Sequence, residues 1–239
     1  MAGVVTPVLV TGLPRSGTSW TGKMLAASGE LVYVNEPLNP QHPPGRSPGV
    51  LNAAVTHRFQ YICPDNEESW LPAFASTVAL RYGFLAELRR NRSPYDLARM
   101  VKYGTSFTLG RLGGRRALLD DPFALFSAGW FAERLGCRVI ILLRDPVSFA
   151  SSWQRLGWTV HFQELLEQPL LVRDQPHLSA LRPWWARRTA SPRPWPSGGR
   201  PEPPPPTWRP GVPGSCWPTT STWPPTRGRA SAVCTNGRA

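Results

Sequence analysis

Short apolar runs alternate with amphipathic segments between Val4 and Leu156. Runs of Val, Ile and Leu predict buried strands, and helical spacing that ends at glycine predicts helices. Strands are expected at Val4–Thr11, Leu31–Asn35, Ala117–Asp120 and Arg138–Leu143. Helices are expected at Thr18–Ser28, Phe123–Leu135 and Pro146–Leu156, with others between about Glu67 and Tyr103, one of which opens at Ser93-Pro94. This alternation predicts an α/β fold in which a parallel sheet carries helices on both faces.

The alternation stops soon after Leu181, and the composition changes with it. Residues 183–239 contain 14 of the 28 prolines and 6 of the 11 tryptophans, but no Leu, Ile, Met, Phe, Tyr or Lys. Such a segment cannot bury enough aliphatic surface to offset the entropy lost on ordering it. We therefore predict a folded domain over residues 1–182 and a disordered tail over residues 183–239.

The charge divides at the same place. The tail has eight Arg and one acidic residue, Glu202, so it supplies +7 of the net charge of +12. The remaining +5 belongs to the first 182 residues. This mild basic excess suits an anionic ligand and does not require nucleic acid.

The cysteines and the start of the chain indicate a cytoplasmic protein. Cys63, Cys137, Cys216 and Cys234 share no CxxC or Cys/His spacing, so we expect free thiols and no metal site. The segment Met1–Val10 has no basic region and leads into a glycine loop, unlike a signal peptide. No stretch of 18 residues is apolar throughout, so no membrane span is expected.

A glycine-bounded loop, Gly12–Gly17, follows the first predicted strand. N–H groups at the start of the next helix, with the hydroxyls of Ser16, Thr18 and Ser19, would form a cradle for a phosphate-type anion. The alternative is an ordinary strand-to-helix turn with a capping hydroxyl. The presence of Arg15 in the same turn favours the anion site.

The residue after the second glycine narrows the choice of anion. An ATP or GTP phosphate loop needs Lys there, and this chain has Thr18. The segment Pro14-Arg15-Ser16-Gly17-Thr18-Ser19-Trp20 instead resembles the P-[KR]-S-G-T-[ST] motif of sulfotransferases that use 3'-phosphoadenosine 5'-phosphosulfate (PAPS). Its Arg variant resembles the tyrosylprotein-type and bacterial branches. The resemblance implies that the nucleotide is bound by Arg15, Ser16, Gly17, Thr18, Ser19 and Trp20.

Two of these residues carry a further expectation. The resemblance makes Arg15 a catalytic residue as well, because a cation is needed where charge develops on the leaving group. Trp20 would stack on the adenine as in some relatives, and core packing is its alternative.

A second motif lies around the fourth predicted strand. Arg144 follows a strand that we expect to be buried, at the edge where open α/β sheets bind ligands. Ser152 comes eight residues later, about two turns into the next helix. A strand-end Arg and a surface Ser would be the plainer interpretation. The pair nevertheless resembles the family's second motif, which binds the 3'-phosphate of PAPS, and two motifs in the right order are more specific than one.

Sulfuryl transfer to a hydroxyl also needs a group that accepts the acceptor's proton. Glu36 follows the second predicted strand, where the tyrosylprotein branch has its catalytic Glu, so the resemblance implies that Glu36 is the base. A solvated loop carboxylate is the alternative. His42 and His57 are rival bases, because cytosolic relatives use His.

The resemblance covers about residues 4 to 180. It implies a P-loop-like three-layer sandwich that transfers a sulfuryl group from PAPS to a hydroxyl or amine, with a small-molecule or glycan acceptor and no metal. Three alternatives stay open. They are a P-loop nucleotide kinase, disfavoured by Thr18, an inactive truncated or frame-shifted member that at most binds the nucleotide, and a polyanion binder that uses the basic tail.

The composition of the tail is typical of a GC-rich gene read in a wrong frame. If the codons of Ser215–Thr226 end mostly in G or C, one shifted reading is Leu-Leu-Ala-His-Asp-Val-Asp-Leu-Ala-Ala-Asp. That peptide resembles a strand of the family and the loop after it. We therefore hypothesise a change of reading frame soon after Leu181.

Overall fold

The computed structural model describes residues 6–40, 53, 55–90, 93–158 and 162–183. Its centre is a four-stranded sheet made of β1 (Val8–Gly12), β2 (Leu31–Asn35), β3 (Arg116–Asp120) and β4 (Arg138–Leu142). The order is β2-β3-β1-β4, and every neighbouring pair is parallel. The predicted α/β fold with a central parallel sheet is confirmed.

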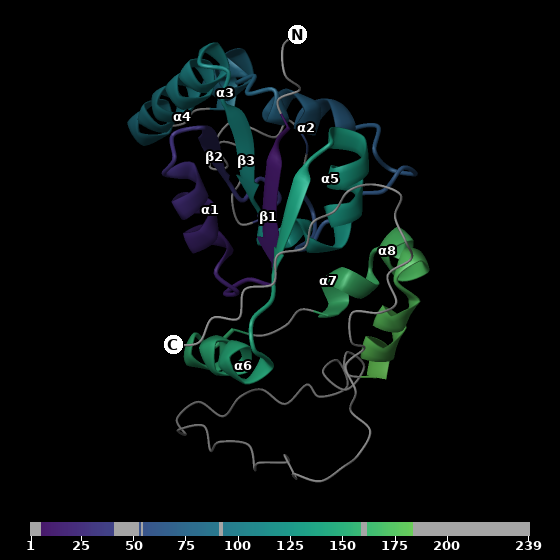
Figure 1. Ribbon diagram of the computed structural model, residues 1–239. Helices are drawn as coiled ribbons and strands as arrows, with labels where there is room; N and C mark the ends of the chain where they lie inside the picture. The colour runs from purple at the N-terminus through teal and green to yellow at the C-terminus, as the bar shows by residue number, and fades with distance from the viewer. Residues whose placement is uncertain (1–5, 41–52, 54, 91–92, 159–161, 184–239) are drawn as a thin grey trace.

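Helices connect the strands (Figure 1). The α-helices are α1 (Thr18–Ala26), α2 (Trp70–Val78), α3 (Phe84–Arg90), α4 (Pro94–Leu112), α5 (Ala128–Leu135), α6 (Pro146–Arg155), α7 (Phe162–Leu166) and α8 (Pro169–Asp174). Two 3-10 helices are η1 (Pro122–Ser127) and η2 (Pro176–Leu181). The predicted opening of a helix at Ser93-Pro94 is confirmed, since the Ser93 hydroxyl accepts a hydrogen bond from the N–H of Asp96 and Pro94 is the first residue of α4.

Alternating strand residues face opposite layers. On one face, Leu9, Val34 and Leu119 pack with aromatic residues of α2, α4 and α5 in the main core. On the other face, Val10 and Leu118 belong to a smaller cluster that includes Leu25 of α1. Figure 1 shows α1 on one side of the strands and α2 and α5 on the other. The sheet is therefore covered on both faces, as the alternation predicted.

The strands differ from the prediction at their ends. Val4 and Val5 lie outside the described residues, and β1 begins only after Pro7, which has no N–H for a ladder. The strand predicted at Arg138–Leu143 is confirmed over Arg138–Leu142, but the expectation that it is buried is wrong. Among the described residues β4 has a partner on one side only, so its residues are exposed or half-buried.

The predicted helix Phe123–Leu135 is divided into η1 and α5. The Asp121 carboxylate accepts a hydrogen bond from the N–H of Phe123 and caps a 3-10 turn there. The α-helix begins only at Ala128. A buried side-chain acceptor, which the apolar spacing does not reveal, therefore decides the start of this segment.

A small second cluster supports one rim of the sheet's carboxyl edge. Leu165, Leu171 and Leu178, from α7, α8 and η2, pack with Tyr61 and Cys63. The side chain of Gln168 accepts a hydrogen bond from the N–H of Tyr61 at 2.7 Å. These helices, which the hydrophobic pattern did not predict, hold the segment that contains Arg58 and Phe59 in place.

Some of the predictions concern residues that the structure describes, and others concern residues outside the described part of the chain. Cys63 and Cys137 are buried free thiols, and burial raises the pKa of Cys137 to about 12. Cys216, Cys234 and the predicted tail from residue 184 onward lie outside the described residues. Within the described part of the chain, no helix combines the length and the apolar character needed to cross a membrane.

Candidate active site

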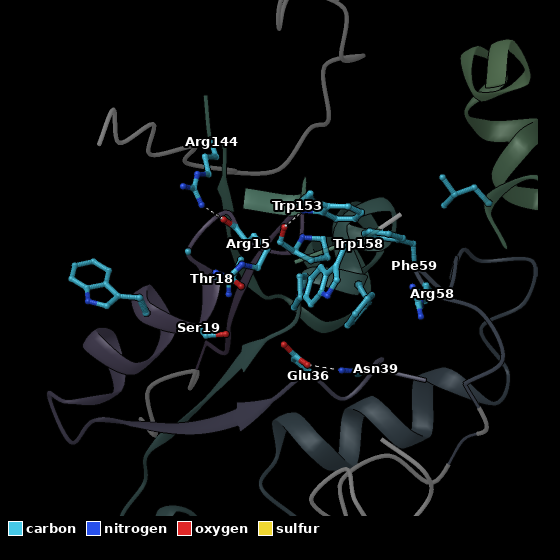
Figure 2. A pocket seen from close by; sticks show the side chains of 17 residues that line it. Arg15, Thr18, Ser19, Glu36, Asn39, Arg58, Phe59, Arg144, Trp153 and Trp158 are labelled. Carbon is cyan, nitrogen blue, oxygen red and sulfur yellow. Dashed lines mark hydrogen bonds between the residues drawn. The ribbon is translucent and has the colours of Figure 1, made fainter. Parts of the chain in front are cut away.

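A cavity of about 670 Å³ lies at the carboxyl edge of the sheet, where parallel α/β proteins bind ligands. Figure 2 shows the side chains that surround it. Polar lining residues come from the loop after β1, from the turn after β2 and from the end of β4, and they include Arg15, Thr18, Ser19, Glu36, Asn39 and Arg144. Apolar lining residues include Phe59, Phe123, Trp153, Trp158 and Leu165.

The loop after β1 is tightly folded. Gly12 has a φ of 154°, and a Cβ there would lie 2.5 Å from the Leu142 carbonyl oxygen, so only glycine fits. Arg15 and Gly17 also have positive φ angles, 76° and 103°. The N–H and the hydroxyl of Ser16 both donate to the Leu13 carbonyl oxygen, at 3.0 and 2.6 Å. Ser16 therefore shapes the loop from within and does not line the cavity.

The first turn of α1 faces the cavity without a side-chain cap. Gly17 occupies the N-cap position and offers no side-chain acceptor to the first N–H groups of the helix. Thr18, Ser19 and Trp20, the first three helical residues, all line the cavity. Uncapped N–H groups at the positive end of a helix are suited to an oxyanion.

Three contacts join this loop to β4 and α6. Arg144 donates from Nη1 to the Arg15 carbonyl oxygen at 2.8 Å, and the Arg15 Nε donates to the Ser152 hydroxyl at 3.4 Å. Trp153 donates its indole N–H to the Pro14 carbonyl oxygen at 3.1 Å. The structure thus brings together the two motifs that the sequence places more than 120 residues apart. Ser152 is buried behind Arg15, while Arg15 and Arg144 are exposed.

Glu36 lies on the opposite wall from Arg144, as Figure 2 shows. Its backbone is left-handed, with φ of 43°, and its N–H donates to the Asp120 carbonyl oxygen at 2.7 Å. Asn39 closes the turn and donates its amide to Glu36 Oε2 at 2.6 Å. The carboxylate is therefore held in a defined orientation at the cavity wall.

Two adjacent carboxyl groups lie beneath this wall. Asp121 accepts hydrogen bonds from the N–H groups of Leu38 and Phe123, at 2.6 and 2.9 Å, which ties the turn after β2 to η1. Asp120 is fully buried and accepts a hydrogen bond from the Tyr33 hydroxyl. Burial raises the pKa of both acids, and their hydrogen bonds oppose that rise.

The structure also bears on the two histidines proposed as rival bases and on the alternative role of Trp20. His57 is described and contacts the Thr56 hydroxyl at 2.8 Å, and it does not line the cavity. His42 lies outside the described residues. Trp20 is 70% exposed, so the core-packing alternative for it is wrong.

Sequence reasoning missed several lining residues: Asn39, Arg58, Phe59, Phe123, Trp153 and Trp158. The position of Asn39, three residues after Glu36 in a tight turn, was a usable signal. Trp153 directly follows Ser152 on α6, and this position next to a motif residue was also a usable signal. Arg58 and Phe59 had none, because their position depends on α7 and α8.

No group of three or more His, Cys, Asp and Glu residues that could hold a metal ion occurs in the part of the chain that the structure describes. The charged groups of the site are instead Arg15, Arg58, Arg144 and Glu36.

The sheet and its cavity define an α/β protein of the class that binds ligands at the carboxyl ends of parallel strands. Comparison with protein families matches residues 7–193 to the sulfotransferase family, so the chain belongs to this family. Membership indicates a transferase that moves sulfuryl groups. The comparisons with curated proteins and with solved structures found no match.

Proposed function

We propose that this protein transfers a sulfuryl group from PAPS to a hydroxyl or amine of an acceptor. The observation that carries the proposal is the convergence of Arg15 and Arg144 on one cavity, opposite Glu36, with Ser152 buried behind Arg15 as a hydrogen-bond partner of its guanidinium. Guanidinium groups bind phosphate and sulfate oxygens through paired hydrogen bonds. The donor carries a phosphosulfate group at the 5' position of its ribose and a phosphate group at the 3' position. Each of these anionic groups needs a cation, and the two arginines supply them.

The residues present fit this donor. The uncapped N–H groups of α1 and the Arg15 guanidinium would hold the 5'-phosphosulfate. Arg144, supported by its contact with the loop backbone, would hold the 3'-phosphate with Ser152. Trp20 is exposed beside the loop and offers a flat face for the adenine.

In the transfer itself, the acceptor oxygen or nitrogen attacks the sulfur and the bond from sulfur to the bridging phosphate oxygen breaks. The proton of the acceptor passes to the Glu36 carboxylate, which Asn39 holds in place. The electron pair of the broken bond stays on the phosphate of adenosine 3',5'-bisphosphate. Arg15 stabilises the charge that grows there.

A nucleotide kinase is the second candidate, because the sheet and the loop have the geometry of a phosphate-binding α/β protein. It is disfavoured since Thr18 occupies the place of the lysine that such enzymes require.

Binding to immobilised adenosine 3',5'-bisphosphate, followed by transfer of labelled sulfate to a panel of acceptors, tests the proposal. Retention that free adenosine 3',5'-bisphosphate reverses, and that magnesium-ATP does not, is the expected result. Magnesium-dependent turnover of ATP without nucleotide bisphosphate binding would contradict the proposal and favour the kinase.

A further inference from the structure

A buried polar network lies between β2, β3 and the first turns of α1. The hydroxyl of Tyr33 donates to Asp120 Oδ2 and lies 3.1 Å from Asn35 Oδ1. Burial, then the neighbouring Asp120, raises the pKa of Tyr33, so the phenol keeps its proton at neutral pH. Tyr33 is therefore a permanent hydrogen-bond donor to Asp120.

The same network reaches the phosphate loop. Ser19 lines the cavity, and its hydroxyl lies close enough to Tyr33 and Asp120 to lower the pKa of both, against the larger effect of burial. Thr18 and Lys23 of α1 also act on the Asp120 carboxyl group and lower its pKa, against the larger effect of burial. The Asp120 carboxyl group thus has neighbours from α1 and β2, and two of them, Thr18 and Ser19, line the cavity.

One atom of the network is unsatisfied. Asp120 is 0% exposed, and its Oδ1 has no hydrogen-bond partner among the described residues. A buried polar atom without a partner is unfavourable.

Close packing fixes α1 over this network. Gly22 faces it, and a Cβ there would lie 2.9 Å from Tyr33 Cε2 and 3.2 Å from Asp120 Cβ. The helix that begins at the phosphate loop therefore rests directly on the Tyr33–Asp120 pair, and the position of one depends on the other.

We propose that Tyr33 and Asp120 are positioning residues for the sulfuryl donor, because they hold Ser19 and the start of α1 in the orientation that binds its phosphosulfate group. This inference rests on the proposed function, since it takes the phosphate loop as the donor site. Neither residue touches the donor. Both act through Ser19.

Tyr33→Phe, Ser19→Ala and the double variant of the full chain test the coupling. The dissociation constant of adenosine 3',5'-bisphosphate and the melting temperature are measured for each. Tyr61→Phe is the matched control, because Tyr61 also donates to a carboxylate, Asp174, at 2.9 Å, and does not line the cavity. Its network packs with α8, away from the phosphate loop.

Each single variant at Tyr33 or Ser19 should weaken binding about tenfold. The affinity of the double variant should be no lower than that of the single variant with the lower affinity, because both changes break the same network. Ser19→Thr, which restores a hydroxyl, should bind more tightly than Ser19→Ala. Tyr61→Phe should lower the melting temperature without altering affinity.

Two results would overturn the inference while leaving the proposed function intact. One is wild-type affinity in Tyr33→Phe, and the other is a double variant whose loss is the product of the single losses. A wild-type chain that does not bind adenosine 3',5'-bisphosphate would overturn the proposed function, and this inference with it.

Discussion

Single side chains with different roles occupy one cavity, and their substitutions separate those roles. Arg144 is exposed and anchored by the Arg15 carbonyl oxygen. If it holds the 3'-phosphate, Arg144→Ala should weaken PAPS much more than adenosine 5'-phosphosulfate, which lacks that phosphate. Loss of a charge-assisted contact is worth about 1.5–3 kcal/mol. Calorimetric titration with both nucleotides measures it, and equal weakening of the two would remove Arg144 from this role.

We predict that Glu36 affects the rate of sulfuryl transfer and not the affinity for the nucleotide. Glu36→Gln keeps the shape of the side chain and removes its basicity. Turnover should fall by about 10²–10⁴-fold, the usual contribution of a general base. Affinity for adenosine 3',5'-bisphosphate should stay the same. A Glu36→Gln protein as active as the wild type would remove Glu36 from the role of base and return it to the rival His42.

Asp120 makes the stability of the protein depend on pH. Burial raises its pKa in the folded state, so on a rise in pH the unfolded chain loses this proton first, near its ordinary pKa of about 3.9. The free energy of unfolding should therefore decrease as the pH rises through the folded-state pKa. Asp120→Asn cannot ionise and should lack this decrease. Denaturant titrations of both proteins from pH 4 to 7 measure the difference, and parallel curves would contradict it.

At the scale of elements, α1 can dock on the sheet only because Gly22 has no side chain. The three nearest atoms to a Cβ there lie at 2.9, 3.2 and 3.3 Å and belong to the side chains of β2 and β3. Gly22→Ala should destabilise the protein by about 1–3 kcal/mol through overpacking. It should also weaken nucleotide binding, because α1 carries the phosphate loop.

Gly129→Ala is the control for this substitution. Gly129 lies within α5, where a Cβ would meet nothing within 4 Å. That change should stabilise the protein by up to about 1 kcal/mol, since alanine is the better helix former. Thermal unfolding of both variants tests the pair, and equal melting temperatures would show that the approach of α1 is not tight.

At the scale of the whole molecule, the outer edge of β4 has no partner strand among the described residues. The composition of residues 183–239 predicts that the tail supplies none, because its 14 closely spaced prolines have no N–H to donate to a strand ladder. Removal of residues 184–239 should therefore leave the melting temperature unchanged. Sulfate transfer should be weak with or without them.

A chain with the alternative reading frame after Leu181 should gain both stability and turnover. The nucleotide sequence of the gene tests the hypothesis first, since a second frame interrupted by stop codons would contradict it. Full transfer activity in the chain as it stands, lost on removal of residues 184–239, would contradict it as well.

The sequence by itself determined the four strands and the order of the motifs. The prediction for β2 matches the observed strand residue for residue. The predicted runs for β1, β3 and β4 differ from the observed strands only at their ends. These features are local, because periodicity, glycine and proline act within a few residues of the chain. The loop that contains Arg15 and the strand end that contains Arg144 were recognisable for the same reason.

Only the tertiary structure decided which residues share the cavity. It placed Arg58 and Phe59 there through contacts with α7 and α8, and it buried the Tyr33–Asp120 pair beneath the helix that follows the phosphate loop. Among the described residues it also made β4 an edge strand in spite of its apolar sequence. Burial and partnership depend on segments far apart in the chain, and the composition of a single segment does not contain that information.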